Sequence, residues 1–352
     1  MKTPPLNSSL RGCLLFLASV LLGACTVPTV TVAPTAIISA TTTPRTAPEF
    51  AEAAEAWRLL SAYGDQVWPG WGTAHIPLLI RSGEFDLLAG HPSPPPGFNL
   101  LPGVTVTNQP VYRYQGHLVP MPAATAWKVN DVWSVAVPTR EEFQHAIDAQ
   151  LGKGVVTLDA VNYIRAIVHE AFHAYALTIV QGDVPNFGAD VDEGALIQQL
   201  VALPDLDQHY AAEGQALVKA LQATDDRITR EAAAEFLKMR QARRVGQDQK
   251  VAAYEQTTEW IEGLARYAEV ALMLHANQAS NDTVTYPAYA KIWQSFLDQL
   301  MKPTASPDGF RGRYYLLGAG QAFLLDRLMP GWKTRALNEK ESLENLLQEA
   351  VK

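Results

Sequence analysis

The chain has 352 residues, 48% of them hydrophobic, and a formal net charge of -8. This size and composition allow one large hydrophobic core or two modest ones. The acidic balance and the scattered basic residues argue against a nucleic-acid partner. One local basic run, formed by Lys238, Arg240, Arg243 and Arg244, ends a helical pattern among Gln and Ala residues, and this setting predicts a solvent-exposed helix face.

The N-terminus has the pattern of an export signal. Two basic residues precede an apolar run over 13–22, which is too short to cross a bilayer as a permanent helix. The following Leu22-Gly-Ala-Cys25 resembles the lipobox of bacterial lipoproteins, in which the cysteine is acylated and becomes the first residue. This resemblance implies a signal peptide over 1–24 and an extracytoplasmic protein, lipid-anchored to the bacterial cell membrane through Cys25. Ordinary signal cleavage near Ala24 is the alternative.

The use of cysteine limits how the mature domain can be stabilised. The chain contains only Cys13, which would leave with the signal, and Cys25, which would carry lipid. No disulfide is then possible, and any metal must be held by histidines and carboxylates. Residues 25–48 are rich in Thr, Pro, Ala and Val and are typical of a tether between the membrane and a folded domain.

The folded domain is predicted to cover residues 49–352 and to be of the α+β class. An Ala-rich helical pattern over 49–62 comes first, and a Trp-Pro-Gly-Trp string then interrupts it. Apolar segments with strand character follow, namely IPLLI, FDLLAG, VTVT, VYRYQGHLV and VWSVAV. They predict a small antiparallel sheet, the N-terminal β subdomain, over about 75–138. From 139 to 352 the long helical periods predict a mainly helical core.

The string His169-Glu170-Ala171-Phe172-His173 lies in one of these helical periods. Asp159 is expected to cap the helix, and Gly182 to follow its end. Two histidines four residues apart project from the same face of a helix, so both imidazoles can bind one ion. Glu170 between them can act as a general base. The motif therefore predicts a Zn²⁺ site with His169 and His173 as ligands, and it requires a third ligand from elsewhere in the chain.

Two glutamates are candidates for this third ligand. Glu193 follows His173 at a spacing that resembles the thermolysin-like pattern, although the dipole of a helix also favours an acidic residue in its first turn. The second candidate, Glu262, belongs to an acidic stripe at helical spacing, whose other members are Glu255, Glu259 and Glu269. Such a stripe by itself indicates a solvated face. A glycine within a helix, such as Gly263, lowers helix stability by about 1 kcal/mol relative to Ala, so a packing reason is expected for it. We expect that reason to be close contact with the helix of the two histidines.

The segment Glu262-Gly-Leu-Ala-Arg-Tyr-Ala-Glu269 resembles the E-G-x-A-x-Y-x-E helix of gluzincin metallopeptidases, particularly those of the alanyl-aminopeptidase type. The resemblance favours Glu262 over Glu193 as the zinc ligand and implies that Glu269 is a carboxylate behind the ligands. The interval between His173 and Glu262 is longer than is usual in gluzincins. A helical insert from about 203 to 250 is expected to account for it.

A third segment, Tyr315-Leu-Leu-Gly318, resembles the Y-x-K-G string whose tyrosine stabilises the oxyanion in the aminopeptidase-like group, with Leu317 in place of the lysine. The G-A-M-E-N type loop of that group, which recognises the substrate amine, is absent from the sequence. The resemblance covers about 160–330. It implies a zinc metallopeptidase that cleaves a peptide or protein substrate, with Glu170 and Tyr315 as catalytic residues. The alternative is a surface lipoprotein that binds zinc or another ligand without hydrolysis, and Glu170 argues against it, because a structural zinc site has no use for a base.

Overall fold

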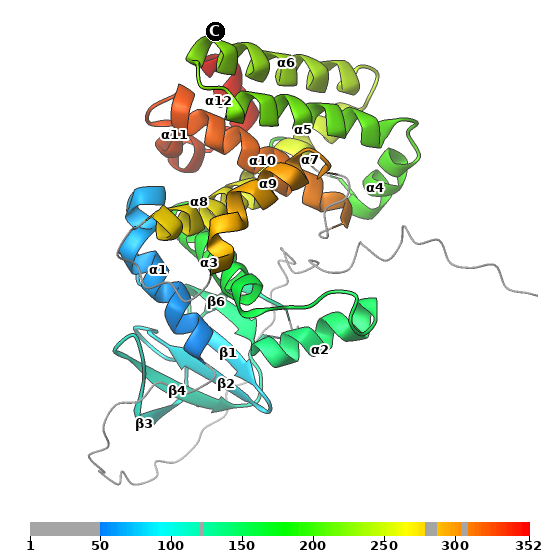
Figure 1. The fold of residues 1–352 in the computed structure, drawn as a ribbon. Coiled ribbons are helices and arrows are strands. Elements are labelled where there is room, and N and C mark those ends of the chain that lie inside the picture. Colours follow the sequence, from blue (N-terminus) through cyan, green and yellow to red (C-terminus); the bar gives the residue numbers. More distant parts are fainter. Residues whose placement is uncertain (1–49, 120–122, 190, 279–286, 304–308) are drawn as a thin grey trace, which may run out of the picture.

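The computed structural model describes residues 50–119, 123–189, 191–278, 287–303 and 309–352 (Figure 1). The predicted signal peptide, the tether and Cys25 lie outside these residues. The described part of the chain combines one sheet with a larger set of helices, in agreement with the α+β class. No helix in this part of the chain is long and apolar enough to cross a membrane.

The sheet contains six strands in the order β3-β4-β2-β1-β6-β5. The strands are β1 Leu78–Ser82, β2 Phe85–Ala89, β3 Asn99–Val106, β4 Gln109–Gln115, β5 Thr125–Val129 and β6 Val132–Pro138. The predicted antiparallel arrangement is wrong for one pair, because β6 lies parallel to β1 whereas the other neighbours are antiparallel. Strands β2, β4 and β3 lie on one side of β1, and β6 lies on the other. The long stretch of chain between β1 and β6 permits these two strands to pair in parallel.

The helices form the larger part of the fold and lie mainly on one side of the sheet (Figure 1). They are α1 Ala51–Val67, α2 Arg140–Leu151, α3 Ala160–Ile179, α4 Glu193–Val201, α5 Leu206–Gln222, α6 Asp226–Arg244, α7 Gln249–Thr258, α8 Leu264–Gln278, α9 Ile292–Leu300, α10 Gly309–Leu328, α11 Trp332–Asn338 and α12 Leu343–Ala350. A π-helical turn, η3 Glu259–Gly263, joins α7 to α8, and a 3-10 turn, η4 Pro287–Lys291, precedes α9.

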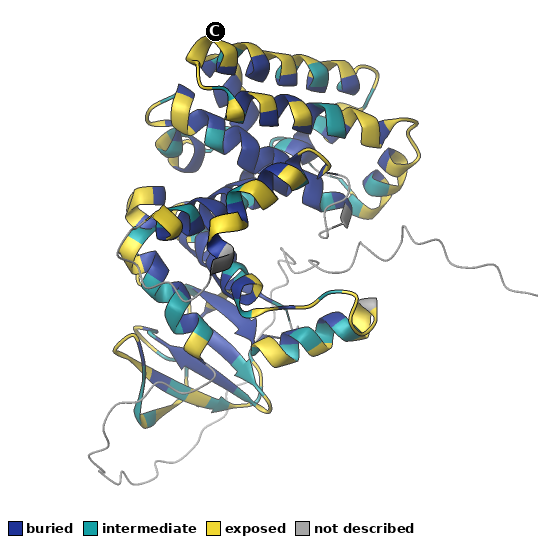
Figure 2. Ribbon diagram, viewed as in Figure 1, coloured by how far each residue is buried: buried dark blue, intermediate teal, exposed yellow. Residues whose placement is uncertain are grey.

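Helix α3 is the helix that connects the sheet to the helical core. The Oδ1 atom of Asp159 accepts a hydrogen bond from the backbone N–H of Asn162 at 2.7 Å, which confirms the predicted cap. The helix packs against β6 on one side and against α1 and α8 on others. Because it is surrounded in this way, α3 is buried over most of its length (Figure 2). Side chains that it projects toward α8 therefore enter the interior of the protein.

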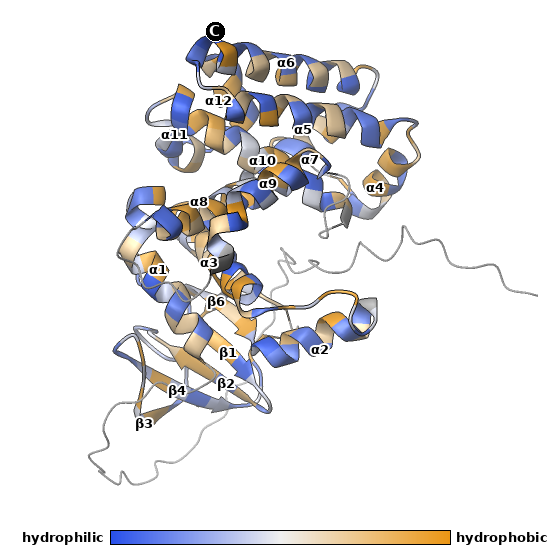
Figure 3. Ribbon diagram, viewed as in Figure 1, coloured by the Kyte–Doolittle hydropathy of each residue, from blue (hydrophilic) through white to orange (hydrophobic). Residues whose placement is uncertain are grey.

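The segment expected to be a helical insert forms a pair of helices, α5 and α6, in which hydrophilic and hydrophobic residues are interspersed (Figure 3). The solvent-exposed face predicted for its basic run is wrong. The Lys238 side chain is 79% exposed, but those of Arg240 and Arg243 are only 1% exposed each. The solvated face that the acidic stripe would indicate is likewise contradicted, because Glu255, Glu259, Glu262 and Glu269 are all buried. Both faces are buried because arginines of α6 pair with glutamates of α7 and η3, a contact that the spacing within either segment does not show.

Candidate metal centre

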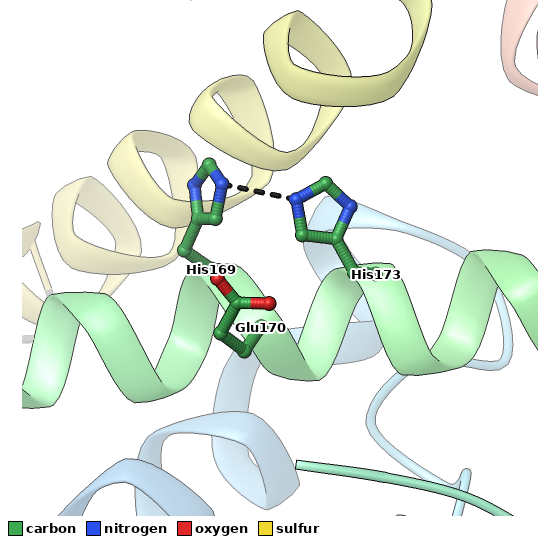
Figure 4. A group of neighbouring side chains, drawn as sticks. All are labelled: His169, Glu170 and His173. Carbon is green, nitrogen blue, oxygen red and sulfur yellow. Dashed lines mark hydrogen bonds between the residues drawn. The ribbon is translucent and has the colours of Figure 1, made fainter. Parts of the chain in front are cut away.

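The two histidines of α3 lie side by side and project toward α8, as Figure 4 shows. The Nε2 atoms of His169 and His173 are 3.1 Å apart, and the two rings meet edge to face at 78°. Both side chains are buried. A buried imidazole nitrogen needs a hydrogen bond or a metal, so two ring nitrogens aimed at one point require a shared partner.

Glu262 supplies that partner from the opposite helix. Its Oε2 atom is 3.3 Å from Nε2 of His169 and 3.2 Å from Nε2 of His173. The three donor atoms therefore form a nearly equilateral triangle. Glu262 belongs to the π turn η3, which joins α7 to α8 and lies against α10. Such turns occur frequently at functional sites because the extra residue locally redirects the side chains of a helix.

Glu170 lies beside this triangle on α3 itself (Figure 4). Among the described residues, His169, Glu170 and His173 form a buried group that could hold a metal ion. Glu262 is nevertheless better placed than Glu170 as the third ligand, because one of its oxygens contacts both Nε2 atoms. Burial raises the pKa of the Glu170 carboxyl group above the ordinary value, although both histidines and the nearby backbone of Ala126 in β5 act to lower it. A carboxylate with a raised pKa beside a metal site suits a general base.

Glu269 stands behind His169. Its Oε2 atom is 3.5 Å from Nδ1 of His169, the ring nitrogen that faces away from Glu262. Its Oε1 atom accepts hydrogen bonds from Nε of Arg165 at 2.5 Å and from Nη1 of Arg266 at 3.0 Å. Although burial acts in the opposite direction, these arginines and His169 hold the pKa of Glu269 well below its ordinary value. A carboxylate on the far nitrogen fixes the orientation of a metal-binding imidazole.

The protonation of the triangle follows from these contacts. Burial disfavours the charged imidazole of His169, but the hydrogen bonds to Glu262 and Glu269 outweigh it and raise the pKa of His169 to about 10. Burial also disfavours the charged form of Glu262, yet His173, His169 and Arg311 hold its pKa well below the ordinary value. The metal-free site at neutral pH is therefore an ion pair of a carboxylate and an imidazolium. A metal ion that binds here must displace the proton of His169.

Tyr315 comes to the site from α10. Its ring stacks on the ring of His169, with centroids 5.8 Å apart and an angle of 10° between the planes. One turn later, Gly318 lies against Gly263 of the π turn, and a Cβ atom added to Gly263 would come within 2.6 Å of the Gly318 Cα atom. Gly263 therefore permits close helix contact, but with α10 and not with α3 as predicted. The two glycines allow the backbones that carry Glu262 and Tyr315 to cross closely.

Glu193 lies near the triangle but does not take part in it. Its Oε1 atom accepts a hydrogen bond from the hydroxyl of Tyr254 at 2.8 Å and lies 3.4 Å from Nε of Arg311. The Nη2 atom of the same Arg311 is 3.4 Å from Oε1 of Glu262. Arg311 thus separates the two candidate ligands, and the Glu193 side chain is 38% exposed. The structure brings Glu262, and not Glu193, to the two histidines.

Some residues around the centre were missed by the sequence analysis. Arg311, Arg165 and Arg266 each pair with a glutamate of the site, and β5 places Ala126 next to Glu170. The arginines had no motif of their own in the sequence. The position of Arg266 three residues before Glu269 was a local signal that could have indicated their ion pair. Comparison with protein-family models, with curated proteins and with solved structures finds no match to this chain.

Proposed function

We propose that this protein is a zinc-dependent hydrolase, a metallopeptidase of the gluzincin type, in which His169, His173 and Glu262 hold the metal. The observation that carries the proposal is the triangle of donor atoms, with sides of 3.1, 3.2 and 3.3 Å. Ligand atoms about 2.1 Å from a tetrahedral zinc ion lie about 3.4 Å from one another. The donor set fits as well, because two imidazoles and one carboxylate, with a fourth position left open, are typical of catalytic zinc.

The proposed chemistry assigns one role to the metal and the others to side chains. Bound zinc lowers the pKa of water and polarises a carbonyl group. Glu170 accepts a proton from the attacking water and returns it to the leaving amine, and its raised pKa brings it closer to the operating pH. The ring of Tyr315 stacks on that of His169, and its hydroxyl is proposed to donate a hydrogen bond to the developing oxyanion. Glu269 keeps His169 in its orientation.

The position of β5 supports a peptide as the substrate. This strand pairs with β6 on one side and ends the sheet on the other, within the part of the chain that the structure describes. Helix α3 packs against β5, and the backbone of Ala126 in that strand lies near Glu170, so the edge of the sheet runs past the proposed general base. An extended peptide can pair with such an edge through main-chain hydrogen bonds. Its scissile bond would then lie near Glu170.

The first test is the metal content of the purified domain. We expect about one zinc per chain, because three protein ligands converge on one point. Affinity should rise with pH, by up to about tenfold per unit between pH 6 and 8, because His169 has a pKa of about 10 without metal and must lose its proton to bind zinc. Elemental analysis and competition with a chromogenic chelator measure both quantities. No zinc after gentle purification contradicts the proposal, and zinc without hydrolysis of any member of a broad peptide library supports the non-catalytic alternative.

The proposal also places the protein outside the cytoplasm, on a lipid anchor at Cys25. The Cys25→Ala variant should therefore move from the membrane fraction to the soluble fraction, because the Thr/Pro-rich tether has no other means of membrane attachment. Fractionation of cells that express both forms, together with metabolic labelling by a fatty acid, measures this. A variant that stays in the membrane, with no lipid on the parent, would show that the signal had been misread.

A further inference from the structure

The π turn that carries Glu262 depends on contacts from outside its own helix. A π turn holds one residue more than an α-helical turn, and its conversion to regular α-helix would rotate a side chain by about 100° around the axis. For Glu262 such a rotation would remove the carboxylate from the two histidines. Isolated π turns are rare, so side chains from neighbouring elements are expected to hold η3 in place.

Arg240 of the helical insert makes the strongest such contact. Its Nη1 and Nη2 atoms donate to the two carboxylate oxygens of Glu259, the first residue of the turn, at 2.8 and 2.5 Å. Gln321 of α10 donates to Oε2 of the same Glu259 at 2.8 Å. All three side chains are buried. Planar two-point pairing of guanidinium and carboxylate is both strong and geometrically specific, so Glu259 is fixed in position and orientation.

The backbone of the turn is fixed on the α10 side as well. A Cβ atom added to Gly318 would lie 2.8 Å from the carbonyl oxygen of Glu259 and 2.9 Å from the Cα atom of Gly263. The turn is thus held by α10 at its backbone and by α6 at the Glu259 side chain. The helical insert therefore does more than lengthen the chain between His173 and Glu262.

We propose that Arg240 is a positioning residue for the metal site: through Glu259 it holds the π turn in the form that directs Glu262 at His169 and His173. The metal part of this statement rests on the proposed function. Among the described residues Arg240 makes no hydrogen bond or ion pair with the histidines or Glu262, and of its three carboxylate partners, Glu213, Glu259 and Glu344, only Glu259 belongs to the π turn. The insert and the metal centre would then form one functional unit.

Arg243 offers a matched control one helical turn away. Both arginines are buried and both pair with Glu213. Arg243 also pairs with Glu255, and Arg240 also pairs with Glu259 and, at 3.5 Å, with Glu344. Each guanidinium also lies over an aromatic ring, at 4.5 and 4.1 Å from the centroids. Arg243 pairs with α7 and not with the π turn. Removal of either arginine breaks a buried ion pair, but only Arg240→Met should release η3.

The experiment compares Arg240→Met, Arg243→Met and the parent chain in zinc affinity and in melting temperature. We expect both variants to melt at lower temperature, and Arg240→Met alone to lose about 10- to 100-fold in zinc affinity, the loss typical when support of a ligand is removed. Cobalt substitution should also change the visible absorption of Arg240→Met and not that of Arg243→Met. Equal affinity loss in the two variants would overturn the proposal.

A second measurement does not depend on the metal. In the metal-free protein, the backbone amides of 259–264 should exchange with deuterium at least about tenfold faster in Arg240→Met than in Arg243→Met. This measurement tests the role of Arg240 separately from the proposed zinc site. A parent chain without zinc affinity would refute the zinc site, but the exchange rates would still show whether Arg240 holds the π turn. If Arg240→Met does not fold, Arg240→Lys keeps the positive charge but loses the two-point pairing with Glu259. Unchanged exchange and unchanged zinc affinity in that variant would also overturn the proposal.

Discussion

Replacement of Glu262 by alanine is expected to lower zinc affinity by several orders of magnitude, whereas Glu193→Ala is expected to retain zinc. The Oε2 atom of Glu262 lies within 3.3 Å of both histidine nitrogens, so its loss leaves two imidazoles to hold the ion. Glu193 contacts Tyr254 and Arg311 instead. The Glu193→Ala change removes a hydrogen-bond acceptor and a negative charge at the start of α4. A negative charge at this end of a helix stabilises it by about 0.3–1 kcal/mol.

Isothermal titration of the metal-free variants with zinc would measure the two affinities under identical conditions. The two positions share their residue type and a distance of 3.4 Å from Arg311, and they differ in that the Glu262 side chain is buried. A general effect of removing negative charge near the site would weaken zinc binding in both variants. If instead Glu193→Ala loses zinc and Glu262→Ala keeps it, Glu193 is the third ligand, as its thermolysin-like spacing indicates. Glu262 would then have only a structural role.

The helix with the two histidines could be predicted because its determinants are local. The capping carboxylate of Asp159 and the apolar stripe lie within a few turns of the motif, and the helix begins where that cap predicts. The convergence of Glu262 on His169 was not visible in any periodicity. It was expected only from the resemblance to the gluzincin helix, because contacts between residues far apart in sequence leave little local signal.

Other parts of the site could not be predicted, for physical reasons. Helical spacing assigned Glu259 and Glu262 to one regular helix, whereas the contact between Gly263 and Gly318 and the pairing with Arg240 accompany a π turn. The short strand β5 was also missed, although its Ala126 lies near Glu170. Its sequence TAWKV contains no apolar run like LLI in β1 or VAV in β6. In both cases tertiary contacts override or supplement the local preference.

The second large effect is expected at Glu170. The Glu170→Gln variant should keep about one zinc per chain while hydrolysis falls by about 10²- to 10⁴-fold, the usual contribution of a general base. Glutamine preserves the size of the side chain, so the local structure should survive. It cannot accept a proton from water. Turnover of the best peptide substrate, with zinc content measured on the same samples, gives both quantities.

The outcome also decides which carboxylate binds the metal. His169 and His173 could in principle be completed by either Glu170 or Glu262, since both carboxylates are buried beside them. If Glu170→Gln loses zinc along with activity, Glu170 is a ligand and the proposed division of roles is wrong. Glu193→Gln serves as the control, because it neutralises a nearby carboxylate that faces Arg311 and not the histidines. Retained turnover in this control, together with lost turnover and retained zinc in Glu170→Gln, would separate proton transfer from metal binding and from the general electrostatics of the site.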